Sequence, residues 1–194
     1  TCALPICCTS FSNNYNYDKS YDFNNINSIA ILPFQVNIDD TITNSTGFYF
    51  KDFIFYHSGD NNVTRGIDQG APDIIAIQLF NIDVEIIDRV HIEKLIEEQK
   101  LSLSGIIVNS NYDKIGNFIS ADALLIGNMN AYRHVANRKL VLTAKLLDTS
   151  SGKVLFSFYS EKGDSFAGLG DGSVFRNDLL TELGKALSLV FSSH

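Results

Sequence analysis

The chain has 194 residues, hydrophobic residues at 45% of its positions and a formal net charge of −7. This length suits a single domain with a complete hydrophobic core. The negative charge argues against nucleic acid as a partner, because binding to phosphate needs a positive surface. It argues equally against docking on anionic lipid by charge. No run of the sequence approaches the roughly 20 apolar residues of a membrane-spanning helix.

The cysteines are confined to the first eight residues of the chain, at Cys2, Cys7 and Cys8. Disulfides therefore cannot staple the domain, and a cysteine nucleophile within it is excluded. The start, TCALPICCTS, looks like the tail of an apolar signal segment followed by a polar stretch, and Leu4-Pro5-Ile6-Cys7 forms a loose lipobox. We expect one of Cys7 and Cys8 to carry a lipid, and the alternative is that these cysteines have no such role.

The N-terminal part of the chain predicts a boundary near residue 28. Residues 1–27 are interpreted as a lipoprotein signal remnant and a linker, because residues 9–27 are polar and rich in Asn, Ser and Tyr without helical or strand periodicity. Their aromatic side chains favour packing on the chain's own domain, with a neighbouring subunit as the alternative. Residues 28–194 form the predicted domain. It begins with a buried strand over residues 28–36, in which Pro33 needs either an edge position or the end of the strand.

Residues 37–70 are interpreted as an inserted aromatic arm. Polar turn residues precede an aromatic run, FYFKDFIFY, and a loop of this length is usually functional or partly structured. One interpretation is an additional strand with core aromatics, and the other is a projecting arm that grips a partner. Both faces of such a strand are apolar apart from one charge each, which predicts that one packs on the sheet and the other on a neighbouring subunit or partner. The predicted contact residues are Phe48, Tyr49, Phe50, Phe53, Phe55 and Tyr56.

Residues 74–105 form the centre of the pattern and predict a helix, a strand and a second helix in close succession. The first helix spans residues 69–81, with Pro72 in its first turn. Its expected packing face contains Ile74, Ile77 and Phe80. The strand contains Val84, Ile86 and Ile87, and we expect it to be buried under both helices. Asp88 caps the second helix, whose helical spacing is set by Ile92, Leu95, Ile96 and Gln99.

The C-terminal half predicts a short helix, three strands and a long final helix. The short helix covers residues 110–120, and the strands lie near residues 122–133, 138–148 and 153–161. In the middle strand, a mostly polar face (Lys139, Val141, Thr143, Lys145, Leu147) alternates with a buried one (Leu140, Leu142, Ala144, Leu146). The final helix spans residues 174–191. Its apolar stripe contains Leu179, Leu183, Ala186, Leu187 and Val190.

Three blocks in this order carry a resemblance to a known family. The run from Ile86 to Lys100, the block ADALLIG at residues 121–127 and the block LVLTAKLLDTSSGKVLF at residues 140–156 resemble the CsgG-like family. These are the curli production and transport lipoproteins of bacterial outer membranes. The resemblance covers roughly residues 28–36 and 67–191. It implies an α+β fold, in which a mixed central β-sheet is packed by helices, as in the periplasmic domain of these proteins.

The resemblance also implies a ring of subunits at the outer membrane, held by an N-terminal lipid. In the curli channel, each subunit adds two long β-hairpins to the shared pore. Here the corresponding gaps, between Tyr132 and Leu140 and after Tyr159, are too short, because one membrane strand needs about 9–11 residues. We therefore expect a CsgG-like periplasmic domain without the pore hairpins.

The sequence shows no pattern of catalytic, metal-ligating or cofactor-binding residues, so an enzyme is the least favoured class. His57, His91, His134 and His194 are scattered without metal-ligand spacing. The first hypothesis is a lipid-anchored, non-catalytic scaffold subunit on the periplasmic face of the outer membrane, in a secretion or flagellar-type ring. Its partners are then itself or related subunits, other outer-membrane complex proteins and, through the lipid, the membrane. The alternative is a periplasmic receptor that binds a ligand or peptide through the arm at residues 37–70.

Overall fold

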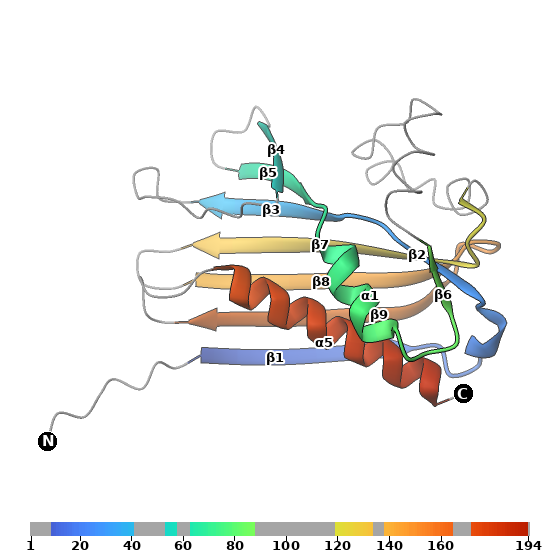
Figure 1. Cartoon of the computed structure of the whole chain (residues 1–194). Coiled ribbons are helices and arrows are strands. Elements are labelled where there is room, and N and C mark those ends of the chain that lie inside the picture. The colour runs from blue at the N-terminus through green and yellow to red at the C-terminus, as the bar shows by residue number, and fades with distance from the viewer. Residues whose placement is uncertain are drawn as a thin grey trace, which may run out of the picture.

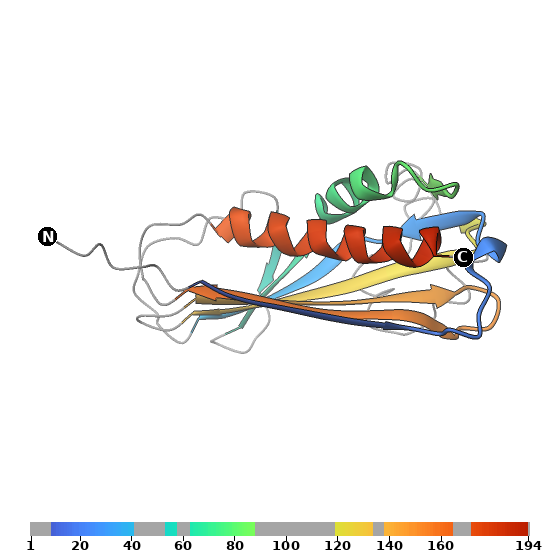
Figure 2. The same cartoon turned by 90° about the horizontal axis from the view of Figure 1, so that it is seen from below.

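The computed structural model describes residues 9–40, 53–57, 63–87, 119–133, 138–164 and 172–193. In this part of the chain, nine strands form one mixed sheet and two α-helices lie on one of its faces (Figures 1 and 2). This architecture confirms the predicted α+β class with a mixed central sheet. The predicted helix after Asp88 lies outside the described residues, as does nearly all of the short helix at 110–120.

The sheet follows the order β1-β9-β8-β7-β3-β5-β4, with β2 and β6 off this path. The strands are β1 (Thr9–Tyr17), β2 (Ser28–Ile31), β3 (Phe34–Asp40), β4 (Phe53–His57), β5 (Val63–Asp68), β6 (Glu85–Ile87), β7 (Ala123–Arg133), β8 (Arg138–Asp148) and β9 (Val154–Asp164). The helices are α1 (Ala71–Leu79), α5 (Gly172–Ser192) and the short 3-10 turn η1 (Phe23–Asn25).

The antiparallel strands β7, β8 and β9 form the centre of the sheet and confirm the three predicted C-terminal strands. The alternation in β8 is also observed: Leu140, Leu142, Ala144 and Leu146 lie in the core beneath the helices. On the other face of β8, Lys139 and Lys145 are exposed, whereas Val141 and Leu147 are buried. The sheet therefore has a helix face, covered by α1 and α5, and an opposite face, over which no described helix lies (Figure 2).

The single strand predicted over residues 28–36 is wrong, because Pro33 divides it into β2 and β3. Proline has no N–H to give to a sheet ladder, so the chain changes course there. Both strands run parallel to β7, while β2 also pairs with β6 and β3 with β5. Residues 37–40, expected to form a turn, instead continue β3 along β7.

Residues 9–17, interpreted from the sequence as part of a linker or arm, form the edge strand β1. They pair antiparallel with β9 from Thr9↔Asp164 to Tyr17↔Phe156. Phe11, Tyr15 and Tyr17 share one side of this strand, and Tyr15 and Phe156 are in ring contact at 5.9 Å. This short alternation of aromatic and polar residues is the strand signal, although Asn13 interrupts it.

The helices predicted at 69–81 and 174–191 are confirmed as α1 and α5, but of the predicted packing face of α1 only Ile74 packs against the core. The predicted stripe of α5 is buried throughout. In α1 the buried residues are Ala71, Pro72, Ile75 and Leu79, whereas Ile77 and Phe80 are 70% and 86% exposed. Helix α1 crosses α5 at Gly184, where an added Cβ would lie 2.6 Å from Gln78 Cβ. This close crossing directs Ile75 and Leu79, rather than Ile77, into the core.

Strand β6 confirms the short strand predicted at Ile86 and Ile87, but the described residues do not test whether two helices cover it. It pairs with β2 away from the main path of the sheet. Glu85 is exposed, and Ile86 and Ile87 are only partly buried. The second of these helices is predicted after Asp88, outside the described residues.

Candidate interaction surface

A buried ion pair joins the helices to the sheet. Arg176, in α5, donates from Nε and Nη2 to the two carboxylate oxygens of Asp68, at the end of β5, each at 2.5 Å. Asp68 is fully buried, and its Oδ1 also accepts hydrogen bonds from the N–H groups of Gly70 and Ala71. Its carboxylate thus lies at the first turn of α1, where negative charge is favourable. We assign these contacts to the fold, because they hold α5 and the start of α1 against the end of β5.

A second polar group stabilises the end of the sheet where β8 turns into β9. Asp148 accepts hydrogen bonds from the hydroxyl groups of Ser150, Ser151 and Tyr21. Burial would raise the pKa of Asp148, but these bonds and one from the Ser151 N–H outweigh it and hold the pKa at about 2. Burial and the bond to Asp148 raise the pKa of Tyr21 to about 12.

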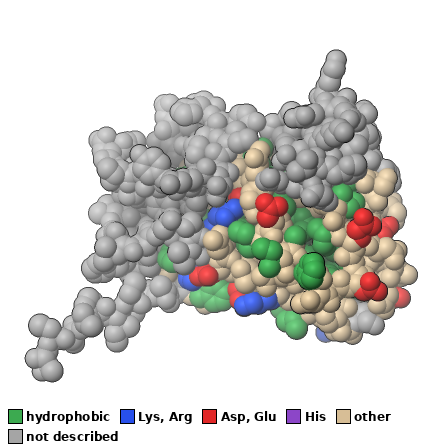
Figure 3. Space-filling model, viewed as in Figure 1, with side chains coloured by type: hydrophobic (Ala, Val, Ile, Leu, Met, Phe, Trp, Pro, Cys, Tyr) green, Lys and Arg blue, Asp and Glu red, His purple; other side chains and the backbone are tan. Residues whose placement is uncertain are grey.

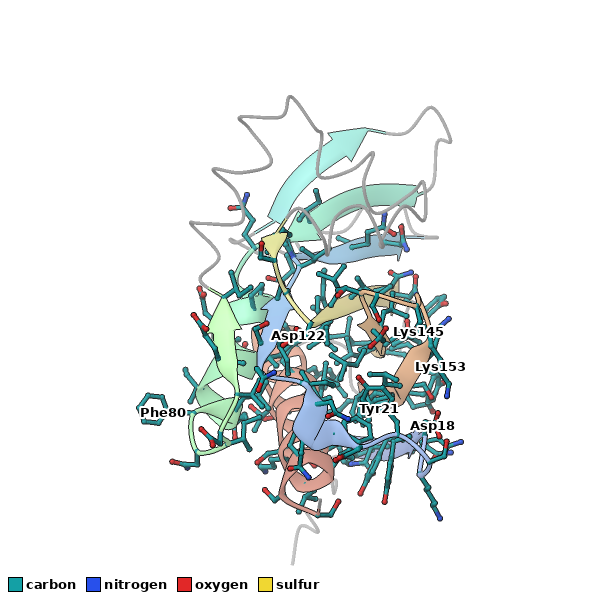
Figure 4. All side chains as sticks on the ribbon, turned by 90° about the vertical axis from the view of Figure 1, so that its right-hand side faces the viewer. Asp18, Tyr21, Phe80, Asp122, Lys145 and Lys153 are labelled. Atoms are coloured by element: carbon teal, nitrogen blue, oxygen red, sulfur yellow. The ribbon has the colours of Figure 1, made fainter. Side chains whose placement is uncertain are left out.

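The same end of the molecule carries two further polar contacts, which Figure 4 places together. Asp18 forms an ion pair with Lys153, and this pair, with Ser20, lowers the pKa of Asp18. Asp122 accepts from the backbone N–H groups of Asn27 and Ser28 and so fixes the start of β2 against β7. All these groups bond to one another or to nearby backbone, so we assign them to the fold rather than to a ligand site.

The opposite face carries a cluster of four side chains, Tyr132, Lys139, Tyr159 and Glu161, here called the tyrosine–lysine cluster. Lys139 Nζ lies 2.6 Å from Glu161 Oε2, and Tyr159 donates its hydroxyl to the same oxygen at 2.6 Å. Both bonds lower the pKa of Glu161, and the bond to Glu161 raises the pKa of Lys139 and of Tyr159. Both tyrosines are exposed. Aromatic rings with a polar tip are typical anchors of protein interfaces.

An amide network continues this polar surface across the neighbouring strands. Asn37 in β3 donates from Nδ2 to the side-chain oxygens of Asn128 at 3.1 Å and Asn130 at 2.9 Å, both in β7. Asn37, one of the polar residues that suggested a turn, is thus a cross-strand partner. The sequence alone does not predict this surface. It indicates the polar side of β8, but the alignment of that side with Tyr132 and Tyr159 requires the strand register.

The helix face carries exposed apolar side chains of its own. Hydrophobic side chains gather on this side of the molecule in Figure 3, and Phe80 projects away from the fold in Figure 4. Ile77 is exposed in the same helix, and Leu189 is exposed in α5. Exposed apolar side chains of this size mark contact surfaces when they are contiguous.

The predicted site residues lie mostly outside the described part of the chain. Cys7 and Cys8 do so, and so do Phe48, Tyr49 and Phe50. Phe53, Phe55 and Tyr56 belong to β4, which is the end strand of the sheet opposite to β1. Among the described residues, no three His, Cys, Asp or Glu side chains are placed to hold a metal ion. No helix in this part of the chain combines the length and apolar character needed to cross a membrane.

Comparison with known proteins finds a matching family model and solved structures of similar fold. The family model "Curli production assembly/transport component CsgG" matches residues 36–141, more than half of the chain. A comparison with curated proteins finds no match. Among solved structures, lipoprotein GNA1162 from Neisseria meningitidis is 15% identical with a TM-score of 0.51, and the alignment covers 83% of this chain and 99% of that one. At such identity the likeness establishes the fold alone.

Two other solved structures align over much of the chain with lower scores. The PelC dodecamer from Paraburkholderia phytofirmans is 14% identical, with a TM-score of 0.47 over 92% of this chain and 98% of that one. The LpoB C-terminal domain from Salmonella enterica is 10% identical, with a TM-score of 0.43 over 70% of this chain and 81% of that one.

Proposed function

Since the chain belongs to the family of the curli production assembly/transport component CsgG, we propose that it is a lipid-anchored scaffold subunit on the periplasmic face of the outer membrane. In this proposal it joins copies of itself or related subunits in the ring of a secretion or flagellar-type complex and carries out no catalysis. The family match over residues 36–141 is the observation that carries the proposal.

The chemistry of the described surface supports a role in protein contact. The tyrosine–lysine cluster and the exposed Ile77 and Phe80 offer aromatic, apolar and hydrogen-bonding groups on two faces. The proposed ring contact uses the aromatic arm at residues 37–70, whose strand β4 is at one edge of the sheet. An edge strand has one side of its backbone available to a partner. The same edge supports the second candidate, a periplasmic receptor that adds an extended peptide to β4.

Lipidation is tested on protein isolated from its native membrane. Mass spectrometry of the N-terminal peptide should find a diacylglyceryl group on Cys7 or Cys8. The paired change Cys7→Ser and Cys8→Ser should release the protein from the membrane fraction, while Cys2→Ser alone, as the matched control, should not. An unmodified N-terminus, or unchanged membrane partition of the double variant, contradicts the anchor.

Assembly is tested by the size of the detergent-solubilised protein. A ring subunit should elute at many times the mass of one chain, and capture from native membranes should recover related subunits or other outer-membrane complex proteins. The receptor should instead elute as a small species and bind a ligand or peptide. A small species without outer-membrane partners would reject the scaffold role.

A further inference from the structure

Strand β1 is one of the two ends of the sheet. It pairs with β9 along all nine of its residues, and no described strand lies on its other side (Figure 1). Native proteins usually protect such an edge with charged residues, proline or a bulge, because an open edge pairs with other chains. Residues 9–17, TSFSNNYNY, contain no charge and no proline, and their register with β9 is unbroken.

The backbone hydrogen bonds show which residues of β1 face outward. The Asp18 N–H donates to the carbonyl oxygen of Leu155 at 2.8 Å, so the even-numbered residues direct their backbone groups toward β9. The odd-numbered residues therefore point theirs away from the sheet. At Tyr17 this outward N–H bonds to Oδ1 of its neighbour Asn16 at 3.0 Å. The outward N–H and C=O groups of Phe11, Asn13 and Tyr15 have no partner among the described residues and can pair with another strand.

The side chains of the same residues are arranged symmetrically about Asn13. Phe11 and Tyr15 are 47% and 40% exposed, and each is two residues from Asn13 on the helix face. Asn13 itself bonds to Glu182 of α5 at 3.4 Å, which fixes that face. If a second β1 runs antiparallel with Asn13 opposite its own counterpart, Phe11 of each copy lies opposite Tyr15 of the other. Aromatic cross-strand pairs stabilise antiparallel sheets.

We propose that β1 is a two-fold contact, in which β1 of a second copy of this chain pairs antiparallel with it about Asn13. Asn13 and its counterpart exchange two backbone hydrogen bonds, and each Phe11–Tyr15 pair exchanges two more, about six in all. A neutral strand suits a second copy of itself, because two chains of net charge −7 meet there without like charges in the paired strands. A charged peptide would find no complementary charge in residues 9–17.

This contact goes beyond the proposed scaffold role and is separate from the ring contact. Strands β1 and β4 are at opposite ends of the sheet order, so a subunit can use both at once. The pairing uses the edge of the sheet, so it does not cover the helix face or the tyrosine–lysine cluster. It would join two sheets into one continuous sheet across the two-fold axis.

The first test places charges at Ser12 and Asn14, which are exposed on the opposite face. In the proposed register, residue 12 of one copy faces residue 14 of the other, at a Cα separation of about 4.5 Å. The full chain with Cys2, Cys7 and Cys8 changed to Ser, and with the ring contact removed by Phe53→Ser and Phe55→Ser, should be a dimer in sedimentation equilibrium. Ser12→Lys with Asn14→Lys should raise the dissociation constant at least tenfold. The matched variant Ser12→Lys with Asn14→Asp should keep the dimer, and added salt should weaken it.

The second test reads the register directly in the same cysteine-free chain. Asn13→Cys should form a disulfide-linked dimer on mild oxidation, because the Cα atoms of residue 13 and its counterpart are about 5.5 Å apart in the proposed register. Asn14→Cys should not, because the Cα atoms of the two copies of residue 14 are about 8 Å apart. Equal cross-linking of both variants would overturn the proposal, as would a monomeric parent chain or a dimer that the Lys–Lys variant leaves unchanged. Circular dichroism should show that each variant keeps the parental fold.

Discussion

The buried pair Asp68–Arg176 connects three elements of the fold. It joins the end of β5, the first turn of α1 and the first turns of α5, and its members are 108 residues apart in the chain. Nothing in the local sequence around either residue indicates the other. A buried ion pair of this kind adds little compared with a well-packed apolar pair, but removing one partner leaves a buried charge without compensation.

We predict that Arg176→Met lowers the free energy of unfolding by about 3–5 kcal/mol, because Asp68 remains buried without its cation. Chemical denaturation at neutral pH measures this change. The control is Lys185→Met, which removes the exposed pair between Lys185 and Glu182 and should cost less than about 1 kcal/mol. Adding Asp68→Asn to Arg176→Met should recover part of the loss. A loss no larger than that of the control would contradict the role of the pair.

The hydrogen bonds to Asp148 predict a pH dependence of stability. The folded pKa of about 2 lies below the ordinary value of 3.8, so the folded state favours the charged carboxylate. The resulting stabilisation is complete above about pH 4 and is lost as the pH falls from 4 through 2. After allowance for solvent screening, we expect Asp148→Asn to cost about 1–2 kcal/mol at pH 6.

The same variant should differ little from the parent chain at pH 2, where Asp148 is about half protonated in the folded state and almost fully protonated in the unfolded state. Denaturation curves at several pH values measure the difference between the two proteins. Asp73, exposed in the first turn of α1, provides the control site. Asp73→Asn should show a much smaller change over the same range. A gap between Asp148→Asn and the parent that stays constant down to pH 2 would rule out the carboxylate as its source.

At the scale of the elements, the sequence predicts those helices and strands whose buried face follows from the regular spacing of their own apolar residues. Helix α5 and strands β7, β8 and β9 were predicted close to their observed bounds, since each has a clear apolar pattern. The packing face of α1 could not be predicted in this way. Its apolar residues surround much of the helix, and the choice among them depends on Gly184 of α5, more than 100 residues later. Strand β1 was not predicted, because its alternation of aromatic and polar residues is short and Asn13 interrupts it.

We predict that Gly184→Leu separates α1 from α5 and lowers the free energy of unfolding by about 1–3 kcal/mol. A Cβ at this position would be 2.6 Å from Gln78 Cβ and 3.4 Å from the carbonyl oxygen of Ile75, so a larger side chain has no space. Thermal or chemical denaturation measures the loss. Lys185→Leu adds the same side chain at the next, exposed position and should change stability little. Equal stability of both variants would show that the two helices can shift without cost.

At the scale of the whole molecule, the described residues form a sheet with helices over one face and with β1 and β4 as the strands at its opposite ends. The resemblance at residues 86–100, 121–127 and 140–156 predicted this class of fold, and the family match confirms the recognition. The strand order was not predicted, because it depends on parallel pairing of β3 with β7 across some 90 residues of chain. The tyrosine–lysine cluster depends on the same register and was missed for that reason.

The lengths of the connections predict that the protein forms no pore of the curli type. Four residues join β7 to β8, and seven join β9 to α5. A hairpin that crosses the membrane needs two strands of about 9–11 residues each, which neither connection can provide. The purified lipidated protein should therefore give no conductance in planar bilayers. Stable single-channel steps, in preparations checked by mass spectrometry for contaminating channels, would contradict this reading of the two connections.

The aromatic run at residues 48–56 predicts where subunits of the proposed ring meet. The structure places β4, which contains Phe53 and Phe55, at the end of the sheet, where one edge of the strand has no described neighbour. Both faces of the run are apolar in sequence, and aromatic residues are the usual anchors of an interface. We therefore predict that Phe53→Ser with Phe55→Ser reduces the assembly to smaller species in detergent, while the circular-dichroism spectrum remains that of the folded protein.

The matched control, Val154→Ser with Leu189→Ser, removes two exposed apolar side chains elsewhere and should leave the assembly intact. Loss of the folded signal in the phenylalanine variant would instead assign this segment to the core.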